Sequence, residues 1–217
     1  MIADRHTYLR SLVTELGKTW PHNRFINIVF HGHSVPAGYF LTPYVNTYGS
    51  YPYLLHRKLK ERFPFAIINS IVTAIGGENS VQGVKRFETE VLCHKPDLLT
   101  IDYGLNDRYV DITACLNAWQ VMIEKALERN IPVILLTPTL DHSYYKQDEN
   151  WELLKKHAEQ IRKLAEKYNV GLVDSFQTFI NYINEGGALE DLLSQSNHPN
   201  EKGHALVAQE LARYFPI

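Results

Sequence analysis

A serine and a histidine near opposite ends of the chain are the residues best suited to nucleophilic chemistry. Ser34 follows the apolar run 25–30 in a tight turn of sequence His-Gly-His-Ser, and His198 stands in Ser-Asn-His-Pro-Asn. A serine hydroxyl is a weak nucleophile that becomes reactive when an adjacent base removes its proton. Ser34 alone has a plainer interpretation as a helix N-cap or a turn hydroxyl. Its assignment as a nucleophile therefore depends on the other loops.

Two of those loops supply neutral hydrogen-bond donors. Gly77 lies in Ile-Gly-Gly-Glu-Asn after one apolar segment, and Asn106 lies in Gly-Leu-Asn-Asp after the next. A backbone N–H and a side-chain amide are the groups that stabilise the oxyanion of acyl transfer. Taken singly, paired glycines usually mark a turn, and Gly-Leu-Asn-Asp could cap a helix. Together with Ser34 and His198, they supply what serine acyl transfer requires.

Short apolar segments alternate with amphipathic ones along the chain, a pattern typical of α/β folds. The predicted strands are 25–30, 65–69, 97–102, 131–136 and 170–173, and the predicted helices are 4–17, 50–62, 80–93, 111–129, 148–168 and 200–214. Right-handed crossovers would build a three-layer αβα fold with a five-stranded parallel sheet. By analogy with flavodoxin, we expect the strand order 2-1-3-4-5. Ligands bind at the carboxyl edge of such sheets, where these loops would meet.

The composition limits the class of protein. A chain of 217 residues with 45% apolar residues fits one domain over 1–217, with a helix within 1–20. The net charge of −2 gives no basic surface for nucleic acid, and no apolar run approaches the roughly 20 residues that span a bilayer. Cys93 and Cys115 are too few for a disulfide framework. We therefore predict a cytoplasmic protein with a small-molecule partner; the sequence does not indicate the oligomeric state.

The four loops together resemble those of the SGNH hydrolases, also called GDSL esterases and lipases. That family carries a serine in Gly-Asp-Ser, a glycine, an asparagine in Gly-x-Asn-Asp and a histidine in Asp-x-x-His-Pro. This chain has Ser34, Gly77, Asn106 and His198 in the same order, within a resemblance that spans 25–214. The resemblance implies a carboxylic ester hydrolase with Ser34 as nucleophile and His198 as base. It further implies an oxyanion hole of the Ser34 N–H, the Gly77 N–H and the Asn106 amide, with no metal or cofactor.

The chain departs from the family pattern at two positions. His33 replaces the aspartate of the first motif, and Gln195 stands where the family has its triad aspartate. In a serine protease, replacing that aspartate by asparagine lowers the rate by about 10⁴ because the histidine adopts the wrong tautomer. We therefore expect a Ser–His dyad in which Gln195 or a backbone carbonyl orients His198, or a carboxylate from elsewhere, with Asp191 the nearest in sequence.

The substrate is indicated only by the aromatic residues. No lid-like apolar segment or membrane-surface helix stands out, which favours a small, water-soluble ester over a long-chain lipid. Tyr39, Tyr144 and Trp151 offer rings that can stack on sugar faces, and we predict that they bind substrate together with His33. An acetylated carbohydrate is therefore the substrate class that we favour.

A metallohydrolase is the first alternative. His31 and His33 form a His-x-His pair at a strand end, with Asp102, Asp107, His198 and His204 as further ligands for zinc or a similar metal. The eight βα units of a metal-dependent barrel do not fit 217 residues. Alternation along a strand would also point His31 and His33 to opposite faces. These points argue against it.

A catalytically weak or decayed binding module on the same fold is the second alternative. The missing triad aspartate motivates it, because a protein that only binds a sugar or acyl ligand needs no activated base. The joint presence of Ser34, Gly77, Asn106 and His198 argues against it, since binding alone requires no such combination. Slow hydrolysis of p-nitrophenyl acetate that is abolished by Ser34→Ala would exclude this interpretation.

Overall fold

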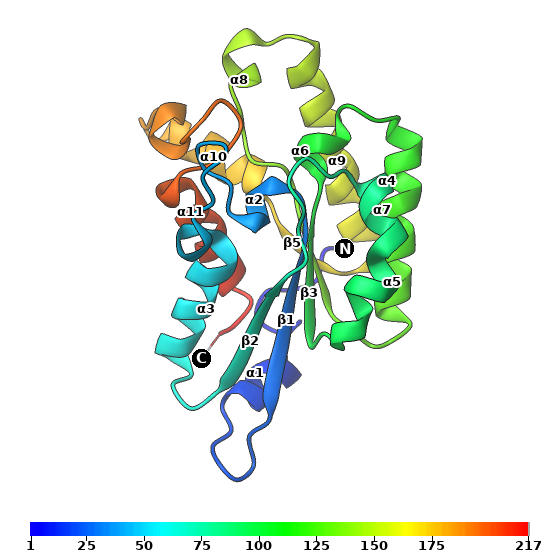
Figure 1. The fold of residues 1–217 in the computed structure, drawn as a ribbon, viewed down its shortest axis with the longest axis vertical. Coiled ribbons are helices and arrows are strands. Elements are labelled where there is room, and N and C mark those ends of the chain that lie inside the picture. The colour runs from blue at the N-terminus through cyan, green and yellow to red at the C-terminus, as the bar shows by residue number, and fades with distance from the viewer. Residues whose placement is uncertain (217) are drawn as a thin grey trace.

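A five-stranded, all-parallel sheet forms the centre of the computed structural model, which describes residues 1–216 (Figure 1). The strands are β1 (Phe25–Gly32), β2 (Ile67–Val72), β3 (Leu98–Asp102), β4 (Val133–Leu136) and β5 (Gly171–Val173). Their order across the sheet is β2-β1-β3-β4-β5. The predicted α/β fold and strand order are therefore confirmed.

Helices cover both faces of the sheet (Figure 1). One face carries α1 (Arg10–Leu16), α3 (Tyr51–Arg62), α10 (Ser175–Asn184) and α11 (Glu201–Ala212), and the other carries α4 (Ser80–Gly83), α5 (Phe87–Glu90), α7 (Ile112–Leu127) and α9 (Glu149–Tyr168). The remaining short helices are α2 (Ser34–Ala37), α6 (Gly104–Asp107) and α8 (Ser143–Lys146), with 3₁₀ turns η1 (Thr47–Gly49), η2 (Val84–Arg86), η3 (Leu92–His94) and η4 (Leu189–Leu192). Within residues 1–216, no helix is long and apolar enough to cross a membrane.

The burial of β1, an interior strand of the sheet, explains why the turn at Ser34 is held in place. Ile28 and Phe30 belong to the apolar cluster on the α3 face, whereas Val29 belongs to the cluster on the α7 face. This alternation buries both sides of the strand, as expected for a continuous apolar run in a parallel sheet. The end of β1 is therefore a rigid platform for the residues that follow it.

The observed helices differ from the predicted ones in several places: the first covers only Arg10–Leu16, the short helices α2, α6 and α8 were not predicted, and two larger differences follow. The expected helix 80–93 is divided into α4, η2, α5 and η3, and the first break falls at Gly83. A Cβ at Gly83 would lie 2.1 Å from the hydroxyl oxygen of Tyr103, so glycine leaves room for that ring. Helix α10 was not predicted; it begins after Asp174, whose side chain accepts a hydrogen bond from the Gln177 amide as an N-cap.

Candidate active site

Ser34 stands at the carboxyl edge of the sheet, two residues after the end of β1. Gly32 pairs with Asp102 of β3, and a Cβ at Gly32 would lie 2.3 Å from the Asp102 carbonyl oxygen. Only glycine therefore allows this close approach of the two strands. The His33 amide also donates to the Asp102 carbonyl, at 3.2 Å. These contacts place Ser34 as the first residue of α2, with its side chain buried at the strand end.

His198 reaches Ser34 from the loop before α11. Its Nε2 lies 3.0 Å from Ser34 Oγ, and its Nδ1 lies 3.1 Å from the main-chain oxygen of Phe40. A carbonyl can only accept, so Nδ1 carries the proton and Nε2 is free to accept from the Ser34 hydroxyl. Burial lowers the pKa of His198 below its ordinary value of 6.5; donation to Phe40 opposes this, and His33 adds to the lowering. His198 is thus a neutral base in contact with the hydroxyl.

Gln195 and Asp191 do not orient His198, and that prediction is wrong. Gln195 Oε1 accepts from the Thr42 amide at 2.8 Å. The exposed Asp191 carboxylate accepts from the Tyr182 hydroxyl at 2.9 Å and from the Ala188 amide at 3.1 Å. The expected alternative of a backbone carbonyl describes the structure, and the carbonyl is that of Phe40.

The loop that carries Gly77 lies beside the Ser34 turn. The Ile75 amide donates to the Gly32 carbonyl at 3.0 Å, so the chain after β2 continues along the end of β1. Gly77 has φ +79°, in the left-handed region that favours glycine. Within residues 1–216, neither the Ser34 nor the Gly77 amide donates a hydrogen bond to another residue. Both N–H groups remain available to an oxyanion.

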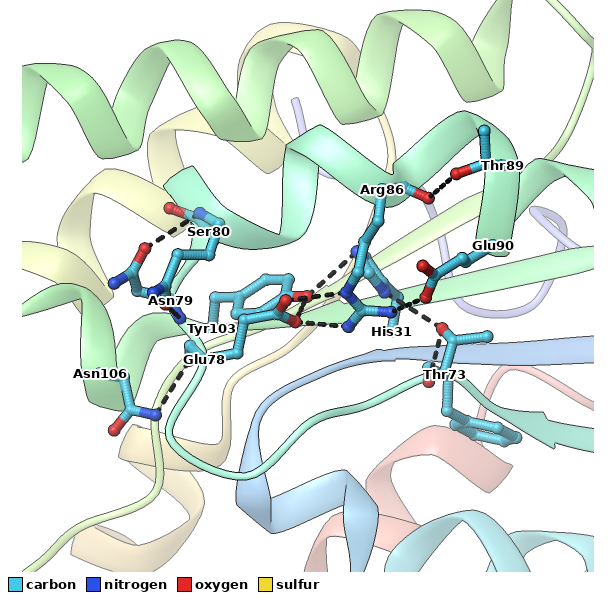
Figure 2. Close-up of polar contacts among 12 residues, drawn as sticks. His31, Thr73, Glu78, Asn79, Ser80, Arg86, Thr89, Glu90, Tyr103 and Asn106 are labelled. Carbon is cyan, nitrogen blue, oxygen red and sulfur yellow. Dashed lines mark hydrogen bonds and ion pairs between the residues drawn. The ribbon is translucent and has the colours of Figure 1, made fainter.

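Asn106 joins this group through the loop of Gly77. Its Nδ2 donates to the main-chain oxygen of Glu78 at 2.9 Å (Figure 2). A side-chain amide has two N–H groups, so one fixes the orientation of Asn106 while the second can bind an oxyanion. Asn106 is partly exposed at the end of β3, as an oxyanion donor must be.

His33 holds the turn that carries Ser34. Its Nδ1 accepts from the Val35 amide at 3.1 Å, which caps α2, and lies 3.5 Å from Ser34 Oγ. Its Nε2 faces the buried Asp102 carboxylate at 3.4 Å. His33 therefore supports the Ser34 turn, and its contact with substrate stays a prediction.

The His31-x-His33 pair does not converge on a common point. The ring nitrogens of His31 lie 3.1 Å from the Thr73 hydroxyl and 3.0 Å from the Tyr103 hydroxyl. Within residues 1–216, the grouping whose donor atoms all lie within 4.8 Å of one another is Asp107, Cys115 and His157, which contains neither histidine of the pair. Both oxygens of Asp107 also accept hydrogen bonds, from the Ser80 amide at 2.8 Å and the Trp119 indole at 2.7 Å. The geometry thus removes the basis of the metallohydrolase alternative.

The predicted aromatic residues divide between the site and the core. Tyr39 lies at the site, because its ring centroid is 6.1 Å from that of His198. The ring also packs on Gly76, where a Cβ would lie 3.0 Å from the nearest ring atoms of Tyr39. Trp151 is only 5% exposed, with its ring stacked on Phe176 at 5.2 Å. Tyr144 packs edge-on against Trp151 at 5.5 Å. Trp151 stabilises the fold, so its predicted stacking on a sugar is wrong, whereas Tyr144 is partly exposed and its contact with substrate stays a prediction.

A polar cavity of about 220 Å³ is lined by residues that lie close in the sequence to Asn106 and His198. Its lining includes Arg108, two residues after Asn106, and Asn197, directly before His198, together with Tyr109, Asp141, His142, Ser143, Asp148 and Ser196. Arg108 is paired with Asp141 at 2.5 Å, and the Arg108 guanidinium lies over the Tyr109 ring. A charged and hydroxyl-rich lining suits a polar ligand better than a long alkyl chain.

Sequence reasoning missed Phe40 and did not assign a role to Glu78. The contribution of Phe40 is a main-chain carbonyl, which leaves no trace in residue type. Glu78 directly follows Gly77, and this position next to a predicted oxyanion donor was the signal in the sequence that could have indicated its role. Phe40 and His198 are 158 positions apart, so only the folded chain brings them together.

The fold is a three-layer αβα sandwich, and the residues described above meet at the carboxyl edge of its parallel sheet. The model of the GDSL-like lipase/acylhydrolase family matches residues 30–206, and the chain belongs to that family. Its class of activity is therefore carboxylic ester hydrolysis. Among curated protein sequences, none matches this chain significantly.

Solved structures share the fold over most of the chain. An acetylxylan esterase from Geobacillus stearothermophilus, Axe2, is 21% identical, with 88% of this chain and 94% of that chain covered and a TM-score of 0.72. A lipase/acylhydrolase from Enterococcus faecalis is 23% identical, with 87% and 94% covered and a TM-score of 0.73. At such identities the likeness establishes the fold.

Proposed function

We propose that this protein hydrolyses small acyl esters of carbohydrates, acetyl esters foremost, through an acyl-enzyme on Ser34. The observation that carries the proposal is the 3.0 Å contact between Ser34 Oγ and His198 Nε2, which pairs a nucleophile with a neutral base. The free amides of Ser34 and Gly77 and the second N–H of Asn106 supply oxyanion donors beside it. Each such donor contributes about 2.7–4 kcal/mol to the transition state.

The reaction follows from these positions. His198 Nε2 removes the hydroxyl proton as Ser34 Oγ bonds to the ester carbonyl carbon, and the carbonyl oxygen becomes an oxyanion held by the three donors. As the tetrahedral intermediate collapses, the C–O bond to the alcohol breaks and His198 returns the proton to that alcohol. Water, deprotonated by His198, then attacks the acyl carbon; the C–Oγ bond breaks, His198 returns the proton to Ser34 Oγ, and a carboxylic acid and free Ser34 are released.

His198 acts in this mechanism without a carboxylate partner. The Phe40 carbonyl holds the tautomer that leaves Nε2 free, which is the property lost when a triad aspartate becomes asparagine. A neutral carbonyl stabilises the imidazolium less than a carboxylate does. Because the pKa of His198 is lowered, the base stays neutral as the pH falls. We expect the acid limb of kcat/KM against pH to lie below 6.5, and an acid limb at or above 6.5 would contradict this assignment.

Two observations support a carbohydrate ester. The polar cavity that Arg108 and Asn197 help to line is small, about 220 Å³, against about 300–1,000 Å³ for pockets of drug-sized ligands. Tyr39 offers a partly exposed ring beside His198. Among proteins of the same fold, Axe2 is an acetylxylan esterase, and two of its solved variants are catalytic mutants in which a serine or a histidine is replaced by alanine.

A substrate panel tests the proposal. p-Nitrophenyl esters of increasing chain length and acetylated xylo-oligosaccharides would be assayed with the wild type and with Ser34→Ala. We expect the highest kcat/KM for acetyl esters, loss of activity in Ser34→Ala, and a fluorophosphonate adduct on the Ser34 peptide by mass spectrometry. An adduct elsewhere would overturn the assignment of Ser34, and a preference for long chains would overturn the carbohydrate assignment. Sugar binding without hydrolysis would instead indicate a binding module.

A further inference from the structure

A buried polar cluster lies directly behind the two loops that carry Gly77 and Asn106 (Figure 2). It consists of His31, Glu78, Arg86 and Tyr103, and we call it the Glu78 cluster. Arg86 Nε donates to Glu78 Oε1 at 2.7 Å, and Arg86 Nη2 pairs with Glu78 Oε2. The Tyr103 hydroxyl donates to Glu78 Oε2 at 2.7 Å. Glu78 is thus held from two directions.

The hydrogen bonds of the Glu78 cluster run in one direction. Since Tyr103 donates its only hydroxyl proton to Glu78, it must accept from His31 Nε2, which lies 3.0 Å away. The other ring nitrogen, His31 Nδ1, then accepts from the Thr73 hydroxyl at 3.1 Å. Burial lowers the pKa of His31 to about 4, so the ring is neutral near pH 7. Burial raises the pKa of Glu78, but hydrogen bonds from Arg86 and Tyr103 outweigh it, so the group is a carboxylate.

The cluster connects the three chain segments on which the proposed chemistry depends. His31 lies on β1, three residues before Ser34; Tyr103 lies three residues before Asn106; and Glu78 follows Gly77. The main-chain oxygen of Glu78 also accepts from Asn106 Nδ2 at 2.9 Å. Glu78 therefore contacts Asn106 directly and is joined to Gly77 by a peptide bond.

Gly77 has few contacts of its own beyond the turn that the Glu78 amide closes by donating to the Ile75 carbonyl at 3.2 Å. It is exposed, its φ is +79°, and the position of a Cβ there has no atom within 4 Å. A glycine in open space has wide backbone freedom, and the direction of its N–H depends on the neighbouring residues. Glu78, which is 8% exposed and fixed by its carboxylate, is the next residue along the chain.

We infer that Glu78 is a positioning residue for the oxyanion hole. Its carboxylate, clamped by Arg86 and Tyr103, anchors the main chain at residue 78, which fixes the adjoining Gly77 and, through the Glu78 carbonyl, Asn106, so that the Gly77 N–H and the free Asn106 N–H point to one place. This inference rests on the proposed function, because it assigns a role within the Ser34 reaction. A displacement of about 1 Å in a catalytic group can lower the rate about 10²-fold. The cluster would therefore act on kcat more than on substrate binding.

Glu78→Gln and Tyr103→Phe test the inference, with Glu90→Gln as the matched control. Glu90 contacts the same guanidinium, through Arg86 Nη1 at 3.2 Å, but it is exposed and contacts neither Gly77 nor Asn106. We expect Glu78→Gln to lower kcat about 10–100-fold with KM nearly unchanged, and to slow fluorophosphonate labelling of Ser34 by a similar factor. Tyr103→Phe should give a smaller loss of the same kind, and Glu90→Gln none.

The outcomes separate this inference from the proposed function. If the wild type hydrolyses no ester, the proposed function fails. If the wild type is active and Ser34→Ala is not, but Glu78→Gln and Tyr103→Phe keep the wild-type kcat and labelling rate, the inference alone is overturned. A rise confined to KM would also overturn it. Should Glu78→Gln not fold, Tyr103→Phe decides, because it keeps the ring and removes only the hydroxyl.

Discussion

Removing the Gln195 side chain should affect catalysis far less than removing His198, although Gln195 occupies the position of the family's triad aspartate. Gln195 Oε1 accepts one hydrogen bond, from the Thr42 amide at 2.8 Å. Such a bond contributes about 0.5–1.5 kcal/mol net. If its whole loss displaced the Phe40 carbonyl and raised the activation barrier, the rate would change by at most about tenfold. Loss of a general base costs about 10²–10⁴-fold. Gln195→Ala should therefore lower kcat by at most about tenfold, and His198→Ala by at least about 10²-fold.

Steady-state hydrolysis of p-nitrophenyl acetate measures this difference, with Ser34→Ala as the background rate. Gln209→Ala, an exposed glutamine on α11, is the matched control and should keep the wild-type kcat. Because Ser34 and His198 act as a unit, the double variant Ser34→Ala/His198→Ala should have a kcat no lower than that of either single variant. A loss in Gln195→Ala close to that in His198→Ala would refute the assignment of the orienting role to the Phe40 carbonyl.

Gln195→Asp extends the same test. The Nδ1–H of His198 already donates to Phe40, and the side chain at 195 faces the Thr42 amide. A carboxylate there should therefore bond to that amide and leave kcat without a gain. A rise of about tenfold or more would mean that the carboxylate reaches His198 and stabilises the imidazolium, contrary to this geometry.

Four further predictions follow from individual contacts. Asn106→Ala should lower kcat about 10²–10³-fold at similar KM, and a change in KM alone would make Asn106 a substrate-binding residue. Burial lowers the pKa of His157 to about 4 and of His204 to about 3, so the unfolded chain binds protons first as the pH falls. Stability, full only well above pH 6.5, should fall by about 3 kcal/mol between pH 6.5 and 5 for the pair, and a flat urea midpoint over that range would contradict this. Trp151→Ala should lower the free energy of unfolding by about 3–5 kcal/mol in chemical denaturation, with KM unchanged because the ring packs in the core. His33→Ala should lower stability by about 0.5–2 kcal/mol and reduce kcat, whereas His33→Asp keeps an acceptor for the helix cap and should restore much of both; equal losses would argue against the capping role.

The local pattern of the chain was sufficient to predict the sheet and the loops that form the site. The apolar run that becomes β1 is buried on both faces, and such a run is a property of adjacent residues. Once the strands are parallel, their carboxyl ends lie at one edge, so Ser34, Gly77 and Asn106 were expected there together. The hydrogen bonds of the Ile75 amide to the Gly32 carbonyl and of Asn106 Nδ2 to the Glu78 carbonyl bring the three loops side by side.

Only the tertiary structure decided which atom orients His198 and which aromatic rings face the site. The Phe40 carbonyl is 158 positions from His198, and every residue type has such a carbonyl, so no side chain marks it. From the sequence, Trp151 fits an exposed stacking surface for substrate as well as a core position, and its stacking on Phe176 in the folded chain decides for the core. Glu78 follows Gly77 in the sequence, but its role depends on Arg86 and Tyr103 arriving from other elements. Periodicity describes neighbours along the chain, whereas these contacts exist only between segments that folding brings together.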